Sequence, residues 1–329
     1  MKIIFIRLLL LTTIFAAGIT NNVCAQSDGQ TATPGQLVDA LHTAFGDHHS
    51  RAVHAKGIIF EGKFTPDAQA AQLTTAFHLQ KQSSKVILRF SNFTGIPDIP
   101  DNIGPANPRG IAIKFIMPDG ANTDIVGHSF NGFPTQNPTQ FRELLLSIGA
   151  SGPDAPKPTR LDTFLSSHPI AKAFLSTQKL PASYATINYF GVNSFKFTNK
   201  KGEAHYIRYQ FVNEAGEQLI TPEQFANAGA NYLGEEIKAR ISKHSIKFKL
   251  YAEIAEDGDK VDDPSIAWPA ERKKILLGEI EIEKLASNTP EQDKALFFIP
   301  NNIPDGIATA DPMLDFRSKA YPISVKGRQ

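Results

Sequence analysis

The segment Asp315-Phe316-Arg317-Ser318-Lys319-Ala320-Tyr321-Pro322 holds the pair of residues from which the fold of this chain is worked out. Arg317 and Tyr321 are four residues apart, so they share one face of a helix, and Pro322 is expected to end that helix after the tyrosine. A guanidinium beside a phenol favours the phenolate, a hard anionic ligand suited to ferric iron, and tyrosine is among the few side chains that hold haem iron. An exposed arginine beside a tyrosine packed at a helix end is the simpler interpretation, unless other segments supply a second face for a haem.

The first 25 residues have the pattern of a cleaved export signal. Lys2 and Arg7 precede the apolar run 8–17, and small residues lead up to Ala25, where a signal peptidase would cut. A membrane anchor is the alternative, but the apolar run is too short to span a bilayer and no stop-transfer pattern follows. We therefore expect residues 1–25 to be a signal peptide and the protein to be periplasmic.

The composition of the chain excludes several kinds of site and partner. The chain has 329 residues, 41% of them hydrophobic, which suits one large domain with a sizeable core. Cys24 is the single cysteine, so cleavage after Ala25 would exclude disulfides, thiolate chemistry, iron–sulfur clusters and cysteine-ligated haem. Loss of Lys2 and Arg7 would change the formal net charge from +1 to −1, and a near-neutral surface argues against nucleic acid as a partner.

Two residues in the first third of the chain carry candidate chemistry. His54 precedes an apolar extended segment, so it is expected at the start of a strand, where a buried structural histidine is more common than a catalytic one. Arg89 lies in the apolar strand 86–91 and is expensive to bury without an anion. A haem propionate and a neighbouring aspartate are both candidates for that anion.

The rest of the chain has the pattern of antiparallel β-structure with helices. Apolar and polar residues alternate as in half-buried antiparallel strands, and the sequence lacks both βαβ alternation and the Gly-x-Gly-x-x-Gly loop of nucleotide-binding folds. No internal repeat or low-complexity linker divides it, so 26–329 is expected to be one domain. The expected strands are 58–60, 86–91, 111–115, 195–197, 206–211, 245–254 and 275–282, and the expected helices are 34–45, 138–148, 161–174 and 222–241.

Several motifs in one order resemble the catalase family along essentially the whole mature chain. Arg51-Ala52-Val53-His54-Ala55-Lys56-Gly57 resembles its distal-histidine motif, Arg89-Phe90-Ser91 its haem-facing Arg-Phe-Ser, and Asn107-Pro108-Arg109-Gly110 its Asp-Pro-Arg-Gly. Arg317 and Tyr321 resemble its proximal motif, on the iron-ligand side of the haem. The resemblance implies an α+β fold, in which haem b is buried between an antiparallel β-barrel and a helix.

The resemblance also implies roles for individual residues. His54 would be the acid–base on the distal side, with Ser91 hydrogen-bonded to it, and three arginines would bind the haem propionates. The implied catalytic residues are His54, Ser91, His128 and Arg317; the implied haem-binding residues are Arg51, Val53, Arg89, Phe141 and Arg328; and the implied iron ligand is Tyr321.

Two departures from the catalase pattern bear on activity. The distal asparagine of the family falls on His128, which is bulkier and ordinarily titrates near neutral pH, unless Asn131 moves into that place. The sequence also stops eight residues after Tyr321, without the C-terminal segments of large catalases. The chain therefore looks most similar to the small catalase-related peroxidases.

The expected activity is reduction of hydrogen peroxide or organic hydroperoxides by a small organic donor, with weak or no oxygen release from peroxide alone. Three alternatives stay open. A related enzyme class rearranges lipid hydroperoxides on the same haem, and an exported haem carrier would need the iron ligand but not His54. A metal-binding module built on His48 and His49 is the third, although adjacent histidines point apart on a strand.

Overall fold

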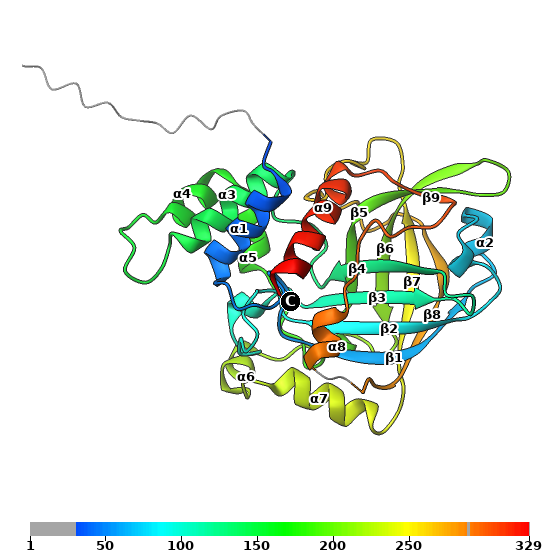
Figure 1. The fold of residues 1–329 in the computed structure, drawn as a ribbon, viewed down its shortest axis with the longest axis horizontal. Coiled ribbons are helices and arrows are strands. Elements are labelled where there is room, and N and C mark those ends of the chain that lie inside the picture. The colour runs from blue at the N-terminus through cyan, green and yellow to red at the C-terminus, as the bar shows by residue number, and fades with distance from the viewer. Residues whose placement is uncertain (1–30, 288–289, 329) are drawn as a thin grey trace, which may run out of the picture. The chain divides into compact units, whose positions relative to one another are not determined.

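An antiparallel sheet closed into a barrel lies at the centre of the fold, as a computed structural model describes it for residues 31–287 and 290–328 (Figure 1). The expected signal peptide lies outside the described residues. In spatial order the barrel strands are β4 (Asn122–His128), β3 (Gly110–Ile116), β2 (Ser84–Ser91), β1 (Gly57–Pro66), β8 (Lys274–Leu285), β7 (Ile246–Ile254), β6 (Ala204–Asn213) and β5 (Tyr189–Thr198). The expected antiparallel barrel with packed helices is thereby confirmed.

The barrel closes where β4 meets β5, through one residue pair, His128 with Phe190. Gly127 makes this approach possible, because a Cβ atom there would lie 2.8 Å from the carbonyl oxygen of Phe190. Further along β5, the short strand β9 (Ile307–Thr309) pairs with the segment 195–197. Alternating side chains fill the interior with aromatic rings, among them Phe64 and Phe115, whose centroids lie 5.0 Å apart edge to face.

A layer of helices forms a second apolar core beside the barrel. Figure 1 shows α1, α3, α4 and α5 gathered on one side, with α9 between them and the strands. Buried residues of α1, α3 and α9, such as Leu41, Leu145 and Ala320, pack in this core. The helices are α1 (Pro34–Phe45), α2 (Ala70–Leu73), α3 (Pro138–Gly149), α4 (Arg160–Ser167), α5 (Pro169–Ser176), α6 (Pro222–Asn227), α7 (Tyr232–Ile241), α8 (Pro290–Ala295) and α9 (Pro312–Gly327), and single 3-10 turns lie at Phe77–Leu79, Gly104–Ala106 and Tyr184–Thr186.

The expectation that Pro322 ends its helix is wrong. α9 continues through the proline to Gly327, although the missing N–H leaves the carbonyl of Ser318 without its intrahelical donor. Packing explains the difference, because the last turns of α9 line a cavity and the Ser324 hydroxyl accepts the backbone N–H of Ala52 at 3.3 Å. Tertiary contact therefore outweighs the local preference.

Two long helices expected from the sequence are each broken in two. α4 and α5 are separated at His168, before the proline at 169. α6 and α7 are separated by residues 228–231, where the carbonyls of Ala228 and Ala230 accept hydrogen bonds from Asn102 and Lys56 instead of continuing a helix. In the described part of the chain, no helix has the length and apolar character needed to cross a bilayer.

Candidate active site

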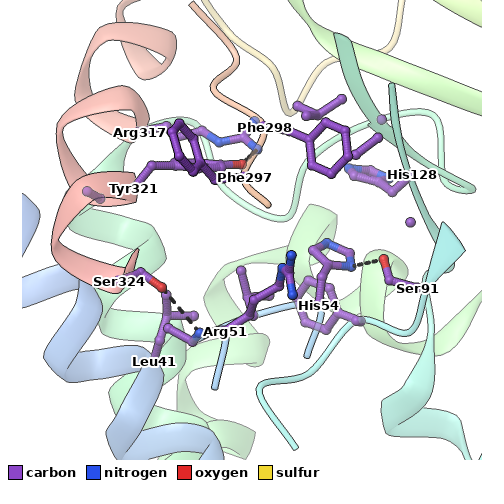
Figure 2. A pocket seen from close by; sticks show the side chains of 18 of the residues that line it. Leu41, Arg51, His54, Ser91, His128, Phe297, Phe298, Arg317, Tyr321 and Ser324 are labelled. Atoms are coloured by element: carbon purple, nitrogen blue, oxygen red, sulfur yellow. Dashed lines mark hydrogen bonds between the residues drawn. The ribbon is translucent and has the colours of Figure 1, made fainter. Parts of the chain in front are cut away.

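One cavity lies between the barrel and α9 and collects every catalytic, haem-binding and iron-ligand residue that the resemblance implied (Figure 2). Its empty space, part of which is open to solvent, is about 1340 Å³. The predicted residues that line it are Arg51, Val53, His54, Arg89, Ser91, His128, Phe141, Arg317, Tyr321 and Arg328. Segments far apart in the sequence thus meet at one place.

The α9 side of the cavity presents a phenol held by a chain of hydrogen bonds. Arg317 donates through Nη2 to the Tyr321 hydroxyl at 3.2 Å, as the four-residue spacing predicts. Its Nη1 donates to Asn193 Oδ1 at 2.7 Å, and Asn193 donates to Asp311 Oδ2 at 2.6 Å. Asp311 also caps α9 by accepting the backbone N–H of Met313. This chain fixes the guanidinium that faces the tyrosine.

His54 lies on another side of the cavity, in a bend before β1 and not in the strand that was expected. Its φ angle of 59° is uncommon for a residue other than glycine. The ring nitrogen Nδ1 lies 3.0 Å from the carbonyl oxygen of Asn92 and 3.1 Å from Ser91 Oγ. A carbonyl only accepts, so Nδ1 carries the proton and Nε2 keeps its lone pair. Gly110 leaves room for the ring, since a Cβ atom there would lie 2.7 Å from Nδ1.

The His54 imidazole is kept neutral by its surroundings. Burial and, after it, the positive charge of Arg89 together lower its pKa to about 3. A neutral imidazole with a free lone pair at Nε2 is a proton acceptor. The predicted hydrogen bond between Ser91 and His54 is confirmed.

His128 lies at the end of β4 and also faces the cavity, whereas Asn131 is not among the described residues that line it. The backbone N–H of Phe130 donates to His128 Nδ1 at 3.4 Å, which places the proton on Nε2. That Nε2 is buried and has no hydrogen-bond partner in the described structure. Burial lowers the His128 pKa to about 3, so the change of charge near neutral pH expected for this histidine is wrong.

At the rim of the cavity, arginines gather around one carboxylate from α8. Arg51 Nη1 contacts Asp293 Oδ2 at 2.7 Å, and Arg89 Nε contacts Asp293 Oδ1 at 3.1 Å. Arg328 donates to the carbonyl of Leu296, just after α8. The aspartate considered from the sequence as a partner for Arg89 is therefore present. Burial lowers the Arg51 pKa to about 9, and the neighbouring Arg89 adds to the shift.

The residues present fit a haem. Arg51 and Arg89 pair with the single carboxylate of Asp293, and Arg328 adds a third positive charge to the group, so an excess of positive charge is available to the two carboxylates of a haem. The buried Arg328 Nε has no partner in the described structure, and it is free to donate to such a group. Apolar side chains, including Val53 and Phe141, also line the cavity.

Sequence reasoning missed several residues of the site. Asp293 lies on a short polar helix and gives no local signal of its contact with Arg51, from which it is 242 residues distant in sequence. Asn193 lies between Val192 and Ser194 in the buried part of β5, and a polar residue in such a strand could have been marked as hydrogen-bonded. In the part of the chain that the structure describes, no cluster of three or more His, Cys, Asp or Glu side chains could hold a metal ion.

Comparisons with known proteins agree with this geometry. A family model described as Catalase matches residues 39–328. A catalase-related peroxidase of Mycolicibacterium paratuberculosis is 32% identical over 302 residues, 90% of this chain and 95% of that protein. Another, of Synechococcus elongatus, is 30% identical over 302 residues, 90% of this chain and 88% of that protein. The fold is similar to that of a fungal catalase at 1.9 Å, with a TM-score of 0.75 and 21% identity, over 85% of this chain and 59% of that one.

Proposed function

The chain belongs to the catalase family, and on that premise we propose that it is a haem b peroxidase that reduces hydrogen peroxide or an organic hydroperoxide with electrons from a small organic donor. Oxygen release from peroxide alone is weak or absent under this proposal. Family members are oxidoreductases that act on peroxide and bind haem. The choice of peroxidase over catalase, the haem type and the donor are the parts proposed for this chain.

One observation carries the proposal, namely that two neutral imidazoles face the same cavity in opposite tautomers. His54 offers a lone pair at Nε2, and His128 offers a proton at Nε2. Peroxide is both a proton donor and a hydrogen-bond acceptor, so the two nitrogens complement it. A haem carrier would have no use for this pair, which favours an enzyme over that alternative.

The chain would hold the haem through three groups of residues. Tyr321 provides the phenol oxygen for the iron, with Arg317 favouring its anionic form. The rim arginines, Arg51, Arg89 and Arg328, are suited to the propionates, and Val53 and Phe141 to the apolar macrocycle. When bound, the haem supplies the iron at which the peroxide O–O bond is broken and the two oxidising equivalents are kept until a donor reduces them.

His54 moves the proton in this reaction. Its Nε2 accepts the proton of the bound peroxide and returns it to the departing oxygen, which leaves as water from hydrogen peroxide or as an alcohol from an organic hydroperoxide. Its Nδ1–H remains on the Asn92 carbonyl throughout, which keeps the ring oriented. The remaining electrons and protons come from the organic donor, which is oxidised as the second oxygen atom becomes water.

The distal side favours an external donor over a second peroxide. In a catalase cycle the second peroxide must be oriented for oxidation, which requires groups placed to within about half an ångström. His128 is larger than the asparagine that the family pattern has at this position, and it lines the cavity. Two relatives that match this chain over most of their own length carry the name catalase-related peroxidase.

The experiment compares wild type with His54→Ala in two assays, oxidation of a phenol or dye by peroxide and oxygen release from peroxide alone. Wild type should oxidise the donor far faster than it releases oxygen, and His54→Ala should slow the donor reaction by about 100- to 10,000-fold. His168→Ala, outside the cavity, is the control and should leave both rates unchanged. Oxygen release at the speed of a true catalase, or a donor rate that survives the loss of His54, would contradict the proposal.

A further inference from the structure

Three successive backbone carbonyls hold His54 in its uncommon conformation. His54 Nδ1 donates to Asn92 O at 3.0 Å, the backbone N–H of His54 to Phe93 O at 2.8 Å, and that of Ala55 to Thr94 O at 2.9 Å. The segment 92–94 therefore binds both the ring and the strained backbone at φ 59°. Whatever fixes this segment also fixes the direction of Nε2.

The side chain of Asn92 anchors that segment in a buried polar network. Its Oδ1 accepts from Arg109 Nη1 at 2.6 Å and from the Tyr184 hydroxyl at 2.8 Å, and its Nδ2 donates to Asp101 Oδ1 at 2.8 Å. Asn92, Arg109 and Asp101 are fully buried. Lys56 Nζ pairs with Asp101 Oδ1 at 2.8 Å, so the buried carboxylate of the network has a charged partner.

We infer that Asn92 is a positioning residue for the proton transfer by His54. The amide side chain fixes the backbone carbonyl of the same residue, this carbonyl takes the Nδ1 proton of His54, and Nε2 is thereby kept as an acceptor aimed into the cavity. Asn92 touches neither the cavity nor the haem site and acts through His54. The inference rests on the proposed function, in which His54 accepts the proton.

Two small molecules that bind haem iron, cyanide and nitric oxide, distinguish a loss of His54 positioning from a general loss of stability. Hydrogen cyanide must give up a proton when it binds haem iron, as peroxide must, whereas nitric oxide carries no proton. In haem-loaded Asn92→Ala, the rate of cyanide binding should fall by about 10- to 100-fold, the range expected when a reacting group is misplaced by about an ångström. The rate of nitric oxide binding should stay within about twofold of wild type.

Asn213→Ala is the matched control. Asn213 is also a buried asparagine with a side-chain hydrogen bond, to Asn188 at 2.8 Å, but it does not line the cavity. It should lose stability in thermal unfolding while cyanide binding is unchanged. Tyr184→Phe removes a single donor from Asn92 and preserves the stacked ring, so it should slow cyanide binding by about threefold. If Asn92→Ala does not fold, the rate of cyanide binding to Tyr184→Phe tests the positioning role of Asn92.

Cyanide binding at the wild-type rate in folded Asn92→Ala, or in Tyr184→Phe where Asn92→Ala does not fold, would overturn the inference. Equal slowing of cyanide and nitric oxide would do so as well, because it would mean a general change in access to the iron. His54→Ala distinguishes a failure of the proposed function from a failure of the positioning role of Asn92 alone. If His54→Ala itself binds cyanide and reacts with peroxide normally, the proposed function fails; if it is slow and Asn92→Ala is not, the positioning role alone fails.

Discussion

At the scale of single residues, the two histidines of the cavity are told apart by which ring nitrogen their neighbours bind. A carbonyl on Nδ1 makes His54 Nε2 an acceptor, and a backbone N–H on Nδ1 makes His128 Nε2 a donor. Burial holds both rings neutral, with pKa values of about 3. Neither the tautomers nor the neutrality could be predicted from residue types, because both depend on backbone groups of other segments.

His128→Asn should shift the balance of activities towards oxygen release without restoring that of a large catalase. An amide keeps a hydrogen-bond donor at this position but is smaller, so a second peroxide gains room. His128→Leu is the matched control. It removes the hydrogen-bond donor, so it should slow oxidation of the phenol or dye without raising oxygen release. Both rates are to be measured in each variant. A ratio of the two rates that is the same in wild type and His128→Asn would show that this side chain does not control the second step.

At the scale of elements, α9 shows which features the sequence predicts and which it does not. The Arg317–Tyr321 contact depends on helical spacing alone, and it was predicted correctly. The end of the helix was not, because contacts with other elements carry it through Pro322. The same holds for the break before α7, which depends on hydrogen bonds from the loop at Asn102 and from Lys56. Local periodicity gives the type of element, and long-range contacts set its ends.

Tyr321→Phe tests the role of α9 as the element that carries the iron ligand. The change removes the phenol oxygen and leaves Arg317 on Asn193, so most haem should be lost, or the axial-ligand bands should change, while the fold persists. The haem-to-protein absorbance ratio and far-ultraviolet circular dichroism measure the two effects. Tyr206→Phe, at an exposed tyrosine on β6, is the control and should retain haem. An unchanged haem spectrum in Tyr321→Phe would remove this residue as the ligand.

At the scale of the whole molecule, buried neutral histidines predict sensitivity to acid. His78 is fully buried against Phe115, and neither of its ring nitrogens has a partner in the described structure. Burial lowers its pKa to about 3, from an ordinary value of 6.5. Between these values the unfolded chain binds a proton that the folded chain does not, so stability is lost as the pH falls from 6.5 towards 3, at about 1.4 kcal/mol for each pH unit.

His78→Leu should reduce this loss. The free energy of unfolding, measured by denaturant at pH 7, 6, 5 and 4, should fall less steeply in the variant than in wild type, by about 1.4 kcal/mol for each pH unit below 6. His205→Leu, at an exposed histidine, is the control and should follow wild type. Parallel curves for wild type and His78→Leu would mean that His78 is not held neutral by burial.

The N-terminal segment is expected to determine where the whole protein is located. We propose that residues 1–25 direct the protein to the periplasm and that the mature chain begins at Gln26, as the charged start and short apolar run indicate. Mass spectrometry of the N-terminal peptide from the periplasmic fraction should give Gln26 as the first residue. A folded, soluble protein that keeps Met1 would contradict this proposal.

The junction of β4 and β5 is the place where the barrel strands are expected to separate most easily. Other neighbouring strands of the described barrel share registers of several residues, whereas this junction has one pair, His128 with Phe190. Strand separation costs the least free energy where the fewest hydrogen bonds are broken, so local opening of the barrel is concentrated there. Both residues of that pair line the cavity, so we expect transient opening of the barrel to occur at the end that contains the ligand-binding cavity.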